Sequence, residues 1–307
     1  MIILLIKLYI NGIQKMLYRD PRPYFIDENV NAIFCDRTYG NPSGHSMYFV
    51  SVFPIMVYMF VNHLKRDCNN SLSSKTVYTI ATLSSAFVIA NIIGRIYLGV
   101  HTIDQIIYGL LVGFALLWYF ACVIYKPIIN YVSRFAERKC TTREAICNLV
   151  VIAFVIFVLV VLSLGMYYRN TVTYDDPVEW IDAIALKCGY PRANVSKHLL
   201  SIKGTEYMTA PATTLGILLG IVFSSWFGSN NTNRVEICPL RRTLKRLVIN
   251  ALLCIPIAIL LVISKGRSFW FVTVFSNIVP VILYTFMLTG PNKMILQRLG
   301  MLHGEQA

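Results

Sequence analysis

The chain has 307 residues, of which 56% are hydrophobic and only 14% are charged, and its mean hydropathy is +0.59. A soluble globular domain usually carries about 25% charged residues, so this composition excludes an ordinary soluble enzyme. The formal net charge of +13 does not indicate nucleic-acid binding in so apolar a chain. It fits the basic cytosolic loops that orient membrane proteins.

Long apolar segments without a charged residue recur between charged loops. They lie at residues 47–62, 77–94, 106–125, 145–168, 208–228, 247–264 and 268–289. A helix needs about 20 apolar residues to span a bilayer, and it satisfies its own backbone there. Together with an apolar segment at 2–18, they predict an all-α polytopic membrane bundle of about eight transmembrane helices. We expect a catalytic helical core at 1–126 and further transmembrane helices at 127–307.

The first segment, residues 2–18, carries Lys7 and Lys15. No small-residue cleavage site follows it, so we interpret it as a membrane helix rather than a signal peptide. It is short for a span. Either Lys7 snorkels to the cytosolic surface, or an upstream segment precedes the helix.

The loops alternate in charge, which predicts the orientation of the chain. Lys and Arg dominate the loops at 64–76, 126–144 and 229–246, whereas those at 19–46 and 169–207 are balanced or slightly acidic. The positive-inside rule places the second group outside the cell or in a lumen. In the extramembrane loop 169–207, the stretch 180–186 suggests a short helix at the membrane interface.

The eight cysteines show no Cys-x-x-Cys pair and no zinc spacing, so no metal site is predicted. Cys35 and Cys188 would lie on the same side of the membrane. Nothing in the sequence singles out a disulfide between them, and none is expected.

The first of three basic motifs follows the first apolar segment. Lys15 and Arg22 are seven residues apart, and Pro21 and Pro23 bracket Arg22. The two prolines predict an extended exit from the helix, which would fix the guanidinium near the membrane surface. A guanidinium is a rigid fork for phosphate oxygens, and an ammonium is a point charge. Taken alone, the pair also fits an ordinary helix-end anchor.

The second motif, Pro42-Ser43-Gly44-His45, immediately precedes an apolar segment. Ser43 is a candidate N-cap, and Gly44 allows close approach of the backbone. The free N–H groups of a helix N-terminus form an anion site. His45 in the first turn could protonate a leaving oxygen, although a cap followed by a surface histidine is the simpler alternative.

The third motif joins the next two apolar segments. Arg95 ends one of them and His101 opens the other. Asp104 and Gln105 follow His101 at i+3 and i+4, hence on its helical face. Either could hold one imidazole nitrogen so that the other is a free nucleophile. Alternatively, Arg95 is a helix-end anchor and His101 an interfacial hydrogen-bonding residue.

The order Lys-x6-Arg-Pro, Pro-Ser-Gly-His and Arg-x5-His resembles the signature of the type-2 phosphatidic acid phosphatase/haloperoxidase superfamily. The resemblance implies a helical core with its pocket at the outer or lumenal end and metal-independent phosphoester cleavage. The resemblance also implies that His101 would attack phosphorus and that His45 would protonate the leaving group. The phosphate oxygens would be held by Lys15, Arg22, Arg95, Ser43 and Gly44.

Two positions depart from the usual signature. Gly94 replaces the usual serine before Arg95, and Gln105 replaces the usual acid, with Asp104 one position early. Glucose-6-phosphatases are similar in having this glutamine and a Cys-acid pair before Pro-Ser-Gly-His (Cys35-Asp36 here). Their nine-helix layout corresponds to the eight segments of this chain with one missing at the amino terminus. The carboxy-terminal half resembles them only loosely.

These features predict an integral membrane phosphatase that hydrolyses a lipid phosphate or a sugar phosphate such as glucose 6-phosphate through a phosphohistidine. The active site would be lumenal or exoplasmic, in the endoplasmic reticulum or another endomembrane rather than the plasma membrane. The expected partners are the phosphorylated substrate and the lipid bilayer, with no nucleic acid and no cofactor. The alternative is a catalytically inactive scaffold or transporter that keeps the pocket, which Gly94 and Gln105 favour. Membrane embedding argues against a haloperoxidase.

Overall fold

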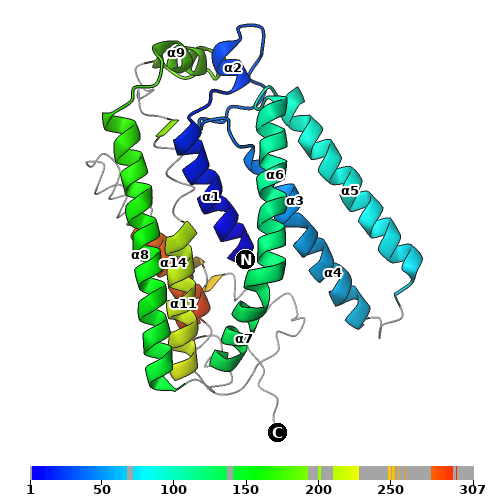
Figure 1. The fold of residues 1–307 in the computed structure, drawn as a ribbon, viewed down its shortest axis with the longest axis vertical. Coiled ribbons are helices and arrows are strands. Elements are labelled where there is room, and N and C mark those ends of the chain that lie inside the picture. Colours follow the sequence, from blue (N-terminus) through cyan, green and yellow to red (C-terminus); the bar gives the residue numbers. More distant parts are fainter. Residues whose placement is uncertain are drawn as a thin grey trace. The chain divides into compact units, whose positions relative to one another are not determined.

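The computed structural model describes residues 2–67, 72–136, 141–192, 200–201, 210–227 and 278–292, and the separate positions 248–249, 251–252, 255, 259 and 295. Every regular element within these residues is helical, so the predicted all-α fold class is confirmed (Figure 1).

The helices of the first half are α1 (Ile2–Tyr18), α2 (Pro23–Ile26), α3 (Gly44–Ser51), α4 (Phe53–Asp67), α5 (Ser74–Tyr97) and α6 (Ile103–Tyr119). A π-helical turn (Phe120–Ile124) joins α6 to α7 (Tyr125–Ala136). The later helices are α8 (Thr142–Val172), α9 (Val178–Lys187), α11 (Ala210–Phe227) and α14 (Val279–Thr289).

The chain forms two compact units. Residues 1–126 and 162–208 make up the first unit, and residues 127–161 and 209–307 the second. The end of α8 and α9 thus belong to the same unit as the amino-terminal helices. The expected catalytic core at 1–126 stays a prediction. All three basic motifs lie in the first unit.

Among the described residues, four continuous helical stretches are long and apolar enough to cross a membrane. They are Gly44–Arg66, Ser74–Tyr97, Ile103–Tyr131 and Ile146–Val172. The apolar helices α1, α11 and α14 are shorter. Most of the expected segment 247–264 lies outside the described residues, so the count of eight spans stays a prediction.

Close packing of α3 on α6 fixes the second motif beside the third. A Cβ atom added at Gly109 would lie 2.7 Å from the carbonyl oxygen of Ser43, and one added at Gly113 would lie 2.3 Å from Cγ2 of Val50. Small residues four apart let two helix backbones approach closely. The Ser43 amide then donates to the carbonyl oxygen of Gln105 at 3.0 Å, which ties the start of α3 to the start of α6.

In the second unit, glycines likewise allow α11 and α14 to pack closely. A Cβ atom at Gly216 would lie 2.4 Å from the carbonyl oxygen of Ile282, and one at Gly220 would lie 2.8 Å from that of Phe286. The Thr289 hydroxyl donates to the carbonyl oxygen of Ile217 at 3.3 Å. Small residues therefore set this helix pair as well.

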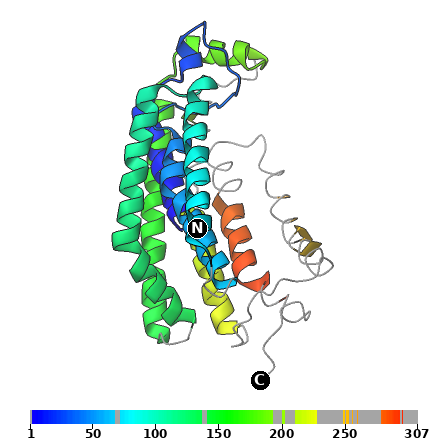
Figure 2. The ribbon, with the colours of Figure 1, turned by 90° about the vertical axis from the view of Figure 1, so that its right-hand side faces the viewer.

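The helices α2 and α9 lie together beyond one end of the α1–α6 bundle in both ribbon views (Figures 1 and 2). The Phe25 and Trp180 rings are 6.4 Å apart, and the Lys187 ammonium donates to the carbonyl oxygen of Val30 at 3.0 Å. The helix expected at 180–186 is confirmed as part of α9.

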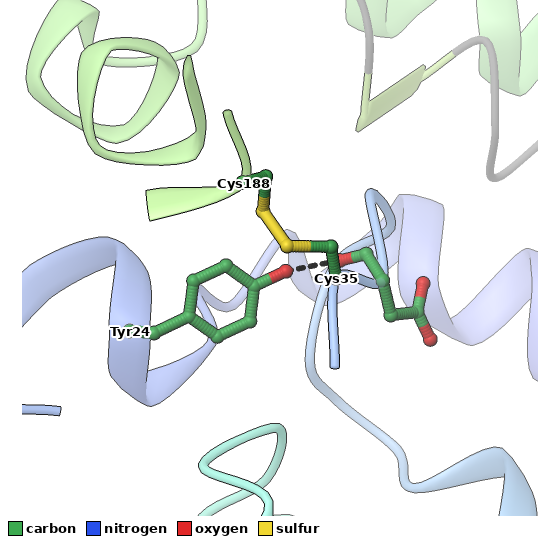
Figure 3. Close-up of a disulfide and its surroundings, with 4 residues drawn as sticks. Tyr24, Cys35 and Cys188 are labelled. Atoms are coloured by element: carbon green, nitrogen blue, oxygen red, sulfur yellow. Dashed lines mark hydrogen bonds between the residues drawn. A yellow bond between two sulfur atoms is a disulfide. The ribbon is translucent and has the colours of Figure 1, made fainter. Parts of the chain in front are cut away.

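This docking overturns one expectation, because Cys35 and Cys188 form a disulfide with a Cα–Cα distance of 5.9 Å. The cysteines are 153 residues apart in sequence, and only the contact of α9 with α2 brings them together. Beside the bridge, the Tyr24 hydroxyl donates to the backbone oxygen of Asp36 at 2.6 Å (Figure 3). The loop after α2 is therefore held from two sides.

Candidate active site

Arg22 is held at the exit of α1 as the prolines predict. The helix ends at Tyr18, and Arg22 is extended, with φ −83° and ψ 156°, just before Pro23 opens α2. The residue is 1% exposed. A buried guanidinium needs acceptors for its five donors, and the loop after α2 supplies most of them.

The acceptors around Arg22 come from two sides. Its Nε donates to the carbonyl oxygen of Thr38 at 2.7 Å, and Nη2 donates to the Thr38 hydroxyl at 2.8 Å. Nη2 also forms an ion pair with Oδ2 of Asp36 at 2.7 Å. Nη1 donates to the carbonyl oxygen of Val100 at 2.7 Å and lies 3.3 Å from Nε2 of His101. Every donor of Arg22 is thus engaged in this state.

Lys15 is 3% exposed and donates to the carbonyl oxygen of Tyr39. The Tyr39 hydroxyl donates in turn to Asp176 at 2.7 Å, and Asp176 pairs with Arg19 at 3.2 Å. Burial and the Asp176 carboxylate raise the pKa of Tyr39 to about 12, so its hydroxyl stays protonated as a donor. The acceptor of Lys15 is therefore anchored to the connection between α8 and α9.

His101 lies in the turn between α5 and α6, where Gly99 has φ +66°. Its Nδ1 is 3.2 Å from Oε1 of Gln105, and Nε2 of Gln105 donates to the carbonyl oxygen of Pro21 at 2.9 Å. The Pro21 contact fixes the amide so that its oxygen faces the imidazole. The hydrogen bonds therefore assign the proton to Nδ1 and leave Nε2 as an acceptor for Arg22.

Of the two candidates for orienting His101, the structure brings only Gln105 to the imidazole. Gln105 is buried on α6, whereas Asp104 is exposed. The reason is the start of α6, where the backbone N–H of Thr102 also donates to Oε1 of Gln105 at 3.4 Å. The Gln105 side chain therefore both orients His101 and caps the start of α6.

The electrostatic environment keeps His101 neutral. Burial lowers the pKa of its imidazole well below the ordinary value, and the positive charges of Arg22 and Lys15 lower it further. Burial would raise the pKa of Asp36, but Arg22 and Lys15 outweigh it and hold that pKa below its ordinary value. The site thus combines an ionised carboxylate with an unprotonated imidazole.

The Pro-Ser-Gly-His motif starts α3 as expected. Ser43 is the N-cap, and its hydroxyl accepts from the amide of Ser46. A Cβ atom at Gly44 would lie 2.6 Å from Oδ1 of Asn11, so a larger residue there would have to displace the Asn11 carboxamide. His45 is exposed, and Nη1 of Arg95 lies 3.1 Å from its Nδ1. His45 and Arg95 form a pair at the more accessible side of the site.

The structure adds residues that the motifs did not single out for roles in the site. Asp36, Thr38 and Tyr39 hold the two buried cations, and Asn11 faces the start of α3. The Cys35-Asp36 pair gave a signal for the first of these, whereas no motif marked Thr38, which binds Arg22 through its carbonyl oxygen and its hydroxyl, Tyr39, which binds Lys15 through its carbonyl oxygen, or Asn11. No group of three or more His, Cys, Asp or Glu side chains that could hold a metal ion is found within the described residues.

Comparison with known proteins identifies similar sequences for the first part of the chain. Residues 1–129 match the model of the PAP2 superfamily. Phosphatidylglycerophosphatase B of Bacillus subtilis (strain 168) is 32% identical over 105 residues, which cover 34% of this chain and 45% of that protein. The match thus covers less than half of the length of this relative. No solved structure matches significantly.

Proposed function

Through residues 1–129 the chain belongs to the PAP2 superfamily, and on that premise we propose that it is an integral membrane phosphatase that hydrolyses a lipid phosphomonoester. The observation that carries the proposal is the fixed imidazole of His101, with Nδ1 on Gln105 and Nε2 toward Arg22. A nucleophile oriented by a third group is the arrangement that covalent catalysis requires.

In the proposed reaction, the Nε2 lone pair of His101 forms a bond to phosphorus while the bond to the leaving oxygen breaks. Protonated His45 donates its proton to that oxygen. Neutral His45 then takes a proton from water, the water oxygen bonds to phosphorus, and the P–N bond breaks to release phosphate. Lys15, Arg22, Arg95 and the start of α3 at Ser43 and Gly44 stabilise the charge on the phosphoryl oxygens.

Two observations support a lipid as the substrate. The relative from Bacillus subtilis is named for a phosphatidylglycerophosphatase activity. The proposed catalytic residues also lie at the ends of candidate membrane spans, with His45 in the first turn of Gly44–Arg66 and Arg95 in the last turns of Ser74–Tyr97. A phosphate headgroup at membrane level would meet them there. A sugar phosphate is the second candidate, favoured by Gln105 at the position where glucose-6-phosphatases also have glutamine.

We also propose that the site faces a non-cytosolic compartment. Disulfides persist in oxidising compartments, and Cys35–Cys188 joins the two loops that the charge pattern places on that side. Sealed vesicles test the orientation. A membrane-impermeant reductant should open the bridge only from the non-cytosolic face, and opening from the cytosolic face would contradict it.

The function is tested by phosphate release from purified protein in mixed micelles containing EDTA. Phosphatidylglycerophosphate, phosphatidate and glucose 6-phosphate are compared as substrates. His101→Gln should abolish both turnover and the labelled phosphoenzyme, whereas the control His63→Gln in the exposed part of α4 should keep both. Turnover that survives His101→Gln would refute the mechanism. Phosphate binding without turnover by the unmodified protein would support the inactive scaffold or transporter.

A further inference from the structure

One face of α1 carries two buried polar residues that the proposed mechanism does not use. Lys7, Asn11 and Lys15 are spaced by four residues and therefore share this face. Lys7 is 6% exposed and Asn11 is 1% exposed. The ammonium of Lys7 thus lies inside the protein rather than at the cytosolic surface, contrary to the snorkelling alternative.

Within the part of the chain that the structure describes, Asn11 faces the start of α3 without a hydrogen-bond partner. Neither polar atom of its carboxamide has a hydrogen-bond partner among the described residues. Its Oδ1 is 2.6 Å from the position of a Cβ atom at Gly44, next to the candidate acid His45. Buried polar groups are nearly always hydrogen-bonded, so an unpaired amide beside a candidate active site calls for a ligand.

Lys7 lies one helical turn from Asn11 on the same buried face of α1, and Asn11 meets the start of α3 at Gly44. An isolated buried ammonium is costly unless an anion accompanies it. Along the axis of α1, Lys7 lies about 12 Å from Lys15 at 1.5 Å per residue, on the side away from the loop after α1. The flexible lysine stem allows the ammonium to lie between these two levels.

We propose that Lys7 and Asn11 of α1, where Asn11 faces the start of α3, form a second anion subsite that binds the phosphodiester group of a glycerophospholipid substrate. The inference rests on the proposed function, in which Lys15, Arg22 and Arg95 bind the terminal phosphomonoester. In a lipid that carries both groups, the phosphodiester is nearer the acyl chains. It would therefore lie deeper along α1 than the monoester, on the side of Lys7. The ammonium and the Asn11 amide group supply the charge and the N–H donors that a phosphodiester accepts.

Substrate selectivity is the first test. Lys7→Met keeps the length of the side chain and removes its charge. It should raise KM for phosphatidylglycerophosphate about 10-fold, the size of one lost hydrogen bond to a charged group. The variant should leave kcat for both lipids, and the KM for phosphatidate, within about two-fold of the unmodified protein. The exposed control Lys75→Met should leave the KM for both lipids unchanged. An equal loss with both lipids, or no loss with either, would overturn the subsite.

A binding experiment tests the subsite without turnover. In a His45→Ala background, ligand-induced shifts of the melting temperature compare glycerol 1,3-bisphosphate with glycerol 1-phosphate. The bisphosphate should bind about 10-fold more tightly, and adding Lys7→Met should remove that margin while preserving the affinity for the monophosphate. The subsite would be refuted if the His45→Ala protein did not prefer the bisphosphate, or if the preference persisted after Lys7→Met was added. If the margin appears but neither lipid is hydrolysed, only the proposed function fails.

Asn11→Leu keeps the proposal testable if Lys7→Met does not fold. Replacing an unpaired buried amide with an apolar side chain of similar size should raise the melting temperature of the free protein. The same variant should reduce the preference for the bisphosphate. A residue that only packs against α3 would not show opposite effects on stability and on binding, so a retained preference in this variant would count against the subsite.

Discussion

Asp36 is the acidic partner of the buried guanidinium in the candidate site, and its removal gives the sharpest test of how the site is held. Asp36→Asn preserves the shape of the side chain and the backbone oxygen that accepts from Tyr24. It removes the negative charge 2.7 Å from Nη2 of Arg22. Because Arg22 is 1% exposed, water cannot replace the lost carboxylate.

The size of the effect follows from this burial. Removing one partner of a buried ion pair costs about 3–5 kcal/mol. Asp36 is 21% exposed, and Arg22 keeps its bonds to Thr38 and Val100, so we expect a smaller loss of about 2–3 kcal/mol. For a chain of this size that corresponds to a fall of roughly 5–10 °C in melting temperature.

The kinetic effect should separate kcat from KM. A guanidinium that shifts by about 1 Å misaligns the phosphoryl group and His101, which can lower kcat about 100-fold. KM should not rise, because Asp36 no longer competes with the substrate for the charge of Arg22. Phosphate release and thermal denaturation are measured on the same preparation. The matched control is Asp182→Asn, whose ion pair with Arg192 is exposed on both sides and should contribute under about 1 kcal/mol. If Asp36→Asn behaves like this control, the guanidinium does not depend on Asp36 and the reasoning is refuted.

Three further predictions concern the nucleophile, the disulfide and the helix packing. Because burial and neighbouring cations lower the pKa of His101, the imidazole should stay neutral as the pH falls from about 7.5 to about 6.5, and a ring NMR signal that titrates in that range would contradict this. Cys188→Ser should cost about 2–4 kcal/mol of stability, and dithiothreitol should lower the melting temperature of the unmodified protein to that of the variant without affecting the variant itself. Gly113→Ala should cost about 1–3 kcal/mol through overpacking, whereas Gly165→Ala, with nothing within 4 Å of the added Cβ atom, should be tolerated in the same denaturation assay.

Local chemistry predicted the parts of the structure that depend on neighbours in sequence. Two prolines predicted the extended Arg22, and the Ser43-Gly44 pair predicted the start of α3. Long uncharged segments predicted the helices that cover most of the described chain. In each case the residues that determine the conformation lie within a few positions of it, so a single sequence contains the information.

Contacts between distant segments could not be predicted in this way. The bridge between Cys35 and Cys188 depends on α9 packing against α2, and no periodicity in either segment encodes that partner. The choice of Gln105 over Asp104 depends on a backbone oxygen of Pro21, which accepts from the Gln105 amide. Both positions satisfy the helical spacing from His101, so spacing alone left the choice open.

The hydrogen bonds of the site also indicate how a substrate must enter it. Every donor of Arg22 is already engaged by protein acceptors, and one of them covers the nucleophilic nitrogen of His101. Lys15 is likewise buried on a backbone oxygen. These two cations can therefore attract an anion by their charge, but they offer it a direct bond only after a contact is exchanged. Arg95 differs, because its contact in this state is the exposed His45. An incoming phosphoryl group can first accept a hydrogen bond from Arg95 in place of His45. The His45 imidazole is then free to carry the proton that it donates to the leaving oxygen. The phosphoryl group then displaces the Arg22 contact from His101, so that the nucleophile is uncovered only when the phosphorus atom is already in place.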